Sequence, residues 1–321
     1  MIPRAVVLTL WLAAGVAQAT NGAPSGLVQA AAYSASKGET GLLVWQGGRT
    51  IFERERNPAA PPPRVFSITK SLISIGVIRE AKAGGLSLGQ AATHRAARGA
   101  VLAELLNQTS GLPPAHREFY GRGLRDKKPV LDKLRRGGSG RFVYGPSHWE
   151  VLAEEIRPRR GSTLEGWIRK FVPGARAEAV ARWTRDGKGQ FFFSTGARMD
   201  APGLLPAGRE VLAGMRRAKW PRDVRVLLVS GTEANRMYAL GFWLNRGSRE
   251  IDVESALGRE QSAEFWREGC VSRSAPPDLL TMVGTRGQRV YAVPSRDLVV
   301  IRLGDGRGFS DAEFLRRLFG A

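Results

Sequence analysis

The sequence has 321 residues, 43% of them hydrophobic, a formal net charge of +20 and a single cysteine. This length and apolar content exclude a disordered chain and allow one large domain or two interlocked ones, and one cysteine excludes an intrachain disulfide. The basic residues are spread along the chain without an aromatic-interleaved basic module, so we expect no specific nucleic-acid partner. The charge predicts only a weak attraction to anionic envelope surfaces.

The first 19 residues have the pattern of a secretory signal peptide. A short basic start, MIPR, precedes the apolar run AVVLTLWLAAGVA, and Ala17-Gln18-Ala19 supplies small residues at the cleavage spacing. The alternative is an uncleaved anchor, but the run is shorter than the ~20 residues that span a bilayer. We therefore predict cleavage after Ala19 and a periplasmic or secreted protein.

Histidines are few and scattered, which bears on the class of chemistry. His94, His116 and His148 show no metal-ligand spacing, and the sequence has no G-x-S-x-G elbow. These absences argue against a zinc hydrolase and against a Ser-His-Asp enzyme. We expect neither a metal nor a cofactor.

The first elements along the chain are a helix, a hairpin and a second helix. Gly26–Ser36 is predicted as a helix, and residues 42–45 and 50–53 as strands joined by a glycine turn. A proline-rich connection, residues 57–63, leads to a buried helix that begins at Ile68 and ends near Gly84-Gly85.

The middle of the chain is predicted to be helical and its last part to return to strands. Residues 121–140 are expected to form a mobile surface loop. Short helices are expected in VLAELLNQ, HWEVLAEEI and TLEGWIRKF, strands at residues 238–245, 289–293 and 298–304, and a last helix in DAEFLRRLF.

This order predicts an α+β fold in which a mixed antiparallel sheet, flanked by helices, is built from both ends of the chain and an all-helical region is inserted. We place the sheet domain at residues 20–75 plus 185–321 and the helical insert at 76–184.

One serine–lysine pair suggests catalysis. A serine hydroxyl needs a nearby base, and positions i and i+3 share a helix face, so Lys70 can reach Ser67. Burial and the helix N-terminus would lower the pKa of that lysine. The spacing alone is weak, because Ser34 and Lys37 repeat it before exposed turn residues. The alternative is that Ser67 only caps the helix.

Two further stretches along the chain contain candidate motifs. Gln108-Thr109-Ser110-Gly111-Leu112-Pro113 comes after a helix, and Phe142-Val143-Tyr144-Gly145-Pro146-Ser147 precedes one. With S-x-x-K and the tail TMVGTRGQRVYAVPSRDLVVIRLG, the sequence resembles the serine β-lactamase and penicillin-binding-protein superfamily, on its class C-like esterase side. The resemblance covers residues 30 to 318.

The resemblance implies a β-lactamase/transpeptidase-like fold and a set of roles. Ser67 would be acylated, Lys70 would take its proton or set the charge of the site, and Tyr144 would assist proton transfer. The backbone N–H groups of Ser67 and Thr285 would form the oxyanion hole, with Gly284 in the third motif beside the substrate.

The sequence also departs from the family pattern. Pro146 replaces the asparagine of Y-x-N, and Ser147 is the candidate replacement for its substrate contact. Met282-Val283-Gly284 replaces K-T-G, and Arg286 is the candidate substitute for its positive charge. These changes favour a neutral ester or amide over a penicillin, as in related esterases and nylon-oligomer hydrolases. A non-catalytic envelope binding protein and a D-amino-peptide hydrolase are the alternatives.

Four other features have simpler interpretations. Asp200 is predicted as a helix N-cap after a turn at residues 194–196, and Cys270 as an unreactive loop residue. His148 could tune Tyr144, and Trp243 is expected in the core or at the wall of an acyl pocket.

Overall fold

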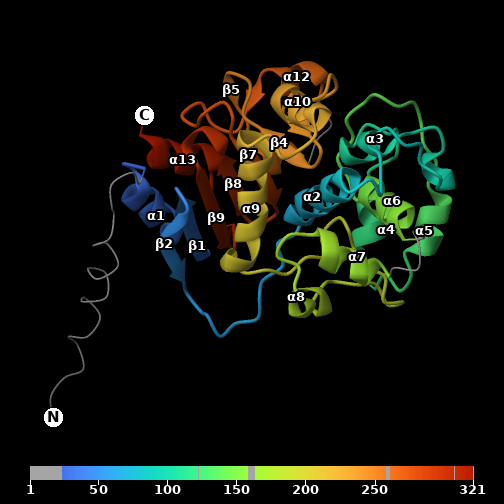
Figure 1. Ribbon diagram of the computed structural model, residues 1–321, viewed down its shortest axis with the longest axis horizontal. Coiled ribbons are helices and arrows are strands. Elements are labelled where there is room, and N and C mark those ends of the chain that lie inside the picture. The colour runs from blue at the N-terminus through green and yellow to red at the C-terminus, as the bar shows by residue number, and fades with distance from the viewer. Residues whose placement is uncertain (1–23, 122, 158–162, 258–260, 307, 321) are drawn as a thin grey trace, which may run out of the picture.

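The computed structural model describes residues 24–121, 123–157, 163–257, 261–306 and 308–320. The predicted signal peptide, residues 1–19, lies outside these ranges. Within them, no helix has the length and apolar character needed to cross a membrane. The described residues form two regions: the sheet with the helices that cover it, on the left of Figure 1, and a region of short helices, on the right.

One antiparallel sheet joins the two ends of the chain. Its strands are β1 (Glu39–Gln46), β2 (Arg49–Glu55), β3 (Tyr238–Ala239), β4 (Phe242–Leu244), β7 (Leu280–Gly284), β8 (Gln288–Val293) and β9 (Leu298–Gly304). They lie in the order β2-β1-β9-β8-β7-β4-β3, and neighbouring strands are antiparallel. A small parallel pair consists of β5 (Arg249–Glu250) and β6 (Gly269–Cys270). The prediction of a sheet built from both chain ends is confirmed, because β1 pairs with β9.

Helices cover both faces of the sheet and fill the inserted region. They are α1 (Leu27–Ser36), α2 (Ile68–Lys82), α3 (Leu102–Leu106), α4 (His116–Tyr120), α5 (Lys128–Lys133), α6 (Ser147–Ile156), α7 (Leu164–Phe171), α8 (Ala177–Ala181), α9 (Ala201–Arg216), α10 (Arg222–Ser230), α11 (Val253–Ala256), α12 (Ala263–Arg267) and α13 (Asp311–Phe319), with short 3-10 turns at Arg95–Ala97 and Pro294–Arg296. The predicted α+β fold is confirmed.

The side chains of β1 show how the sheet buries both of its faces. Successive residues of a strand point to opposite sides. Leu42 and Val44 pack in the cluster that contains α1 and α13, whereas Leu43 and Trp45 pack in the cluster that contains α2 and α9. The middle of the strand is therefore buried on both faces, which is why residues 42–45 form a continuous hydrophobic run instead of an alternation.

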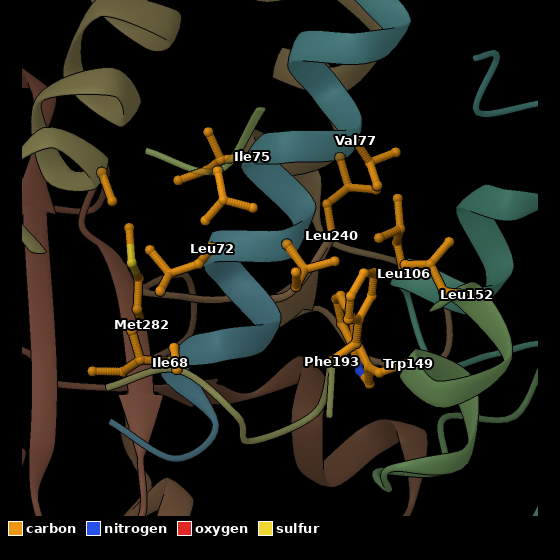
Figure 2. Close-up of a cluster of buried hydrophobic side chains, with 14 of the residues drawn as sticks. Ile68, Leu72, Ile75, Val77, Leu106, Trp149, Leu152, Phe193, Leu240 and Met282 are labelled. Carbon is orange, nitrogen blue, oxygen red and sulfur yellow. The ribbon is translucent and has the colours of Figure 1, made fainter. Parts of the chain in front are cut away.

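Helix α2 is the central packing element between the sheet and the helical region. Twelve of its 15 residues are buried, so it is enclosed on all sides instead of presenting one apolar stripe. Ile68 and Leu72 lie toward Met282 on β7, and Val77 lies toward Leu106 and the helical region (Figure 2). The predicted boundary at residues 75/76 falls inside this helix, and the division into two domains stays a prediction.

Three segments differ from the expectation. Residues 238–245 form two short strands, because Leu240 and Gly241 turn the chain with φ angles of 48° and 79°. The surface loop predicted at residues 121–140 contains α5 and a fully buried Lys127. Cys270 lies in β6, not in a loop, and burial raises the pKa of its thiol to about 11.

Candidate active site

Four of the predicted site residues line one cleft between β7 and the helical region. Ser67, Lys70, Tyr144 and Thr285 all border this cleft, which has a volume of about 790 Å³. They come from the start of α2, the turn before α6 and the end of β7. The fold thus brings residues separated by more than 200 positions to one place.

Ser67 occupies the N-cap position of α2, but it does not cap the helix. Its backbone is already helical (φ −69°, ψ −7°), and its side chain makes no capping hydrogen bond. Instead, its Oγ lies 2.9 Å from the Nζ of Lys70. The preceding Phe66 has a φ of 48°, a conformation that is costly for a bulky residue and that is typical of strained functional turns. The capping alternative is therefore not supported.

Lys70 is almost completely buried, with 2% of its surface exposed. Its Nζ also donates to the backbone carbonyl of Ser194 (3.0 Å) and lies 4.9 Å from the centre of the Tyr144 ring. Burial lowers the pKa of Lys70 to about 7, although the carboxylate of Glu150 acts in the opposite direction. At neutral pH, a large share of molecules therefore carries the free amine that a base requires.

Tyr144 is held in the cleft by the segment of the second family-like motif. The side chain of Gln108 accepts a hydrogen bond from the N–H of Gly145 (2.7 Å), and its backbone carbonyl accepts one from Val143 (3.0 Å). Burial raises the pKa of Tyr144 to about 12, even though a hydrogen bond with Ser67 lowers it. The phenol is protonated at neutral pH and is suited to donate a proton.

His148 anchors this turn from behind and is not exposed to the cleft. Its two ring nitrogens lie 3.0 Å from the Oγ of Ser110 and 2.9 Å from the carbonyl of Val143. Burial lowers its pKa to about 4, so the ring is neutral. His148 therefore does not contact the Tyr144 hydroxyl through these bonds; it holds the backbone of Val143, next to Tyr144, in place.

Gly284 allows the end of β7 to contact the chain just before the nucleophile. A Cβ at this position would come within 2.3 Å of the carbonyl oxygen of Val65, so any side chain would push the strand away. Gly284 itself is buried, and the following Thr285 borders the cleft. The proposed oxyanion role of the backbone N–H groups of Ser67 and Thr285 stays a prediction.

Comparisons with known proteins give structural likenesses only. Neither the family models nor the curated proteins match this sequence. Among solved structures, "EstCE1, a hydrolase with promiscuous acyltransferase activity" is 15% identical with a TM-score of 0.63, covering 92% of this chain and 98% of that one. A class C β-lactamase from Rhodobacter sphaeroides is 17% identical with a TM-score of 0.57, covering 89% and 96%. A D-stereospecific amidohydrolase from a Streptomyces species is 13% identical with a TM-score of 0.56, covering 92% and 98%.

The chain has the β-lactamase/transpeptidase-like fold. The resemblance inferred from the motifs is therefore confirmed at the level of the fold.

Within this fold, the third motif carries no positive charge in the strand. Met282, which the motif resemblance aligns with the family's lysine, packs against Ile68 and Leu72 in the core (Figure 2). Arg286 lies on the exposed turn after β7, with its guanidinium 5.9 Å from the ring of Phe66 and its N–H bonded to Glu254. It stands at the rim of the cleft and is not one of its lining residues.

Ser147 does not occupy the place for which it was predicted. Its side chain is fully buried, and its hydroxyl donates a hydrogen bond to the carbonyl of Pro113. The first turn of α6 directs it into the supporting loop, where that carbonyl needs a donor. It therefore does not replace the missing asparagine as a contact in the cleft.

Several residues at the site were missed by sequence reasoning. Tyr120 borders the cleft and is 41% exposed; the buried surroundings of its hydroxyl raise its pKa, although hydrogen bonds with Ser194 and Thr195 act in the opposite direction. Glu150 accepts hydrogen bonds from the N–H (3.0 Å) and Oγ (2.6 Å) of Ser194, and from Lys127. No local pattern marks these residues, because each acts through a contact distant in sequence.

The remaining expectations concern the core and metals. Trp243 is 1% exposed and packs 5.9 Å from the Tyr144 ring, so it supports the site from the core. The Asp200 side chain accepts from the N–H of Gly203, as expected of an N-cap. In the described ranges, no cluster of three or more His, Cys, Asp or Glu side chains could hold a metal ion.

Proposed function

We propose that this protein is a serine hydrolase that cleaves a carboxylic ester or amide through an acyl-enzyme. The observation that carries the proposal is the buried Lys70, with its Nζ 2.9 Å from the Oγ of Ser67 and a pKa lowered to about 7. A surface lysine would be protonated at neutral pH and could not act as a base. The likeness in fold to hydrolases supports the same reaction class.

The reaction has two halves. In acylation, Ser67 Oγ bonds to the substrate carbonyl carbon while its proton passes to Lys70. Collapse of the tetrahedral intermediate breaks the bond to the leaving group, which takes a proton from Tyr144; Lys70 then reprotonates the phenol. In deacylation, water adds to the acyl carbon and gives a proton to Lys70; the bond between that carbon and Ser67 Oγ then breaks, Ser67 takes the proton back from Lys70, and the carboxylic acid is released. The opposite pKa shifts of Lys70 and Tyr144 favour this division into base and acid.

The substrate is proposed to be a neutral ester or amide, and penicillin hydrolysis is disfavoured. In the family, the K-T-G lysine helps hold a substrate carboxylate, and the apolar Met282 occupies that position here, buried in the core. We propose that the protein acts in the periplasm or outside the cell, because of the signal peptide predicted at residues 1–19. N-terminal sequencing of the exported protein tests cleavage after Ala19.

A fluorophosphonate probe with intact-mass analysis tests the proposed reaction. We expect one adduct on the purified mature protein, none on Ser67→Ala, and a wild-type adduct on the control Ser36→Ala, which removes an exposed serine. Absence of an adduct on the wild type, or an equal adduct on Ser67→Ala, would favour the non-catalytic binding protein. A panel of short esters, amides, D-amino peptides and a chromogenic cephalosporin then defines the substrate class.

A further inference from the structure

A buried ion pair lies behind the catalytic cleft, on the side of the helical region. The Nζ of Lys127 is 2.7 Å from a carboxylate oxygen of Glu150, and both side chains are fully buried. Lys127 also donates to the carbonyl of Phe191 (2.6 Å), and its backbone N–H donates to Asp186 (2.9 Å). The Lys127 ammonium lies 5.7 Å from the ring of Phe192. A buried pair with this many partners requires an explanation, because burying two charges is costly.

This ion pair is connected to Lys70 through a single residue. The other carboxylate oxygen of Glu150 accepts from both the N–H and the hydroxyl of Ser194, and the carbonyl of Ser194 accepts from the Nζ of Lys70. The chain of contacts therefore runs from Lys127 through Glu150 and Ser194 to the amine beside the nucleophile. It joins the N-cap residue of α5 to α6 and, through Ser194, to α2.

The tyrosine and the two histidines near Lys70 are uncharged at neutral pH, and the charged Arg64 and Glu254 border the same cleft. Burial raises the pKa of Tyr144 to about 12. His116 and His148 both have pKa values lowered by burial and by the charge of Lys70. Among the described groups that act on the pKa of Lys70, Glu150 is thus the one that carries a full negative charge.

We propose that Lys127 and Glu150 are positioning residues that set the charge of Lys70. Lys127 balances the carboxylate of Glu150, so that the carboxylate can orient Ser194 without holding Lys70 in its ammonium form. This inference deepens the proposed function, since it explains how a lysine close to a glutamate can still serve as a base.

The pair acts as a dipole, and removing either partner leaves a single charge in a medium of low dielectric constant. Lys127→Met leaves the carboxylate unbalanced, which stabilises the ammonium of Lys70 and raises its pKa. Glu150→Gln leaves the ammonium of Lys127, which disfavours a second positive charge and lowers the pKa of Lys70 further. The two substitutions must therefore act in opposite directions.

An NMR titration of the mature protein labelled with ¹³Cε-lysine tests this. The sequence has nine lysines, and Lys70→Met assigns the signal. We expect an apparent pKa near 7 for Lys70 in the wild type, a downward shift of about one unit in Glu150→Gln and an upward shift of similar size in Lys127→Met. The double variant should return to within about half a unit of the wild type, because neither charge remains.

Glu155→Gln is the matched control. Glu155 is a buried carboxylate on the same helix, but it accepts hydrogen bonds from Thr93 and His94, away from Lys70. It should leave the titration of Lys70 unchanged. Equal shifts in the control and in Glu150→Gln would overturn the proposal.

The proposal is also overturned if both single variants shift the pKa in one direction or leave it unchanged. If Lys127→Met does not fold, the isosteric Glu150→Gln decides alone, through the presence or absence of a downward shift. The titration does not depend on turnover. A wild type that titrates as expected but gives no fluorophosphonate adduct would refute the proposed function and leave this inference standing.

Discussion

Two turns of this chain share the pattern S-x-x-K, and only one of them brings its serine and lysine side chains into contact beside the cleft. Ser34 lies in the last turn of α1, where its Oγ accepts a hydrogen bond from the Nε of Arg302 (3.1 Å), and Lys37 is the C-cap of that helix. Ser67 and Lys70 lie in the first turn of α2, 2.9 Å apart. The spacing is identical, but the environment of the lysine is not.

The comparison is close, because each lysine also lies over a tyrosine ring. The Nζ of Lys37 is 5.7 Å from the ring centre of Tyr33, and that of Lys70 is 4.9 Å from Tyr144. Lys37 is partly exposed, whereas Lys70 is buried. Burial of the amine, not its distance in sequence from a serine, lowers its pKa and so suits it to the proposed role of a base.

The largest expected difference between the two turns is the effect of removing the lysine of each. Lys70→Ala should lower the rate constant of fluorophosphonate labelling by about 10²- to 10⁴-fold, the usual contribution of a general base. Lys37→Ala, its counterpart at the other S-x-x-K turn, should label at the wild-type rate. Equal rates for the two variants would show that Lys70 is not the base, and circular dichroism checks that both variants fold.

Removing the hydroxyl of the tyrosine beside each lysine should give a smaller difference in activity between the two turns. Tyr144→Phe is expected to reduce ester turnover by about 10²-fold, because the phenol that reprotonates the leaving group is lost. Tyr33→Phe removes a hydroxyl that accepts a hydrogen bond from Ser310, and it should leave turnover unchanged. Wild-type turnover in Tyr144→Phe would exclude this tyrosine from proton transfer.

The pH dependence of labelling should follow the titration of Lys70. Its pKa is lowered to about 7, so the free amine predominates above this pH and the ammonium below it. The labelling rate should therefore fall about tenfold for each pH unit below 7. The profile of Lys37→Ala should be superimposable on that of the wild type, whereas an acid limb near pH 4 would point to a carboxylate as the base.

The smallest effect on activity is expected from Ser34→Ala. Loss of its hydrogen bond with the buried Arg302 should lower the free energy of unfolding by about 1 kcal/mol. Urea denaturation measures this loss, and fluorophosphonate labelling should not change. A labelling defect in the folded variant would mean that the first S-x-x-K turn contributes to the site after all.

The sequence predicted the parts of the site that depend on local order. The S-x-x-K spacing at a helix start indicates Ser67 and Lys70, whereas Tyr144 and Thr285 follow from the resemblance of the later motifs to the family pattern. Ser147 was misplaced, because nothing local shows that Pro113 would take its hydroxyl. Such contacts depend on how separate segments pack.

The buried ion pair between Lys127 and Glu150 could not be predicted from the sequence for the same reason. Lys127 lies in a stretch rich in glycine, lysine and arginine that resembles a surface loop, and its partner Glu150 is 23 positions away. Likewise, the strand expected at residues 238–245 is split by the positive φ angles of Leu240 and Gly241. That turn fits against α2, where the Oγ of Ser71 donates to the carbonyl of Gly241.

The pairing of β1 with β9 has a consequence for the order in which the cleft is assembled. Leu43 pairs with Ile301, so the first strand has no partner on this edge until the last strand has been synthesised. Contacts of such long sequence separation slow folding. A nascent chain that ends before Thr285 contains Ser67 and Lys70 but lacks one wall of the cleft. The cleft therefore cannot be complete until the last strands of the chain have been synthesised and have joined the sheet.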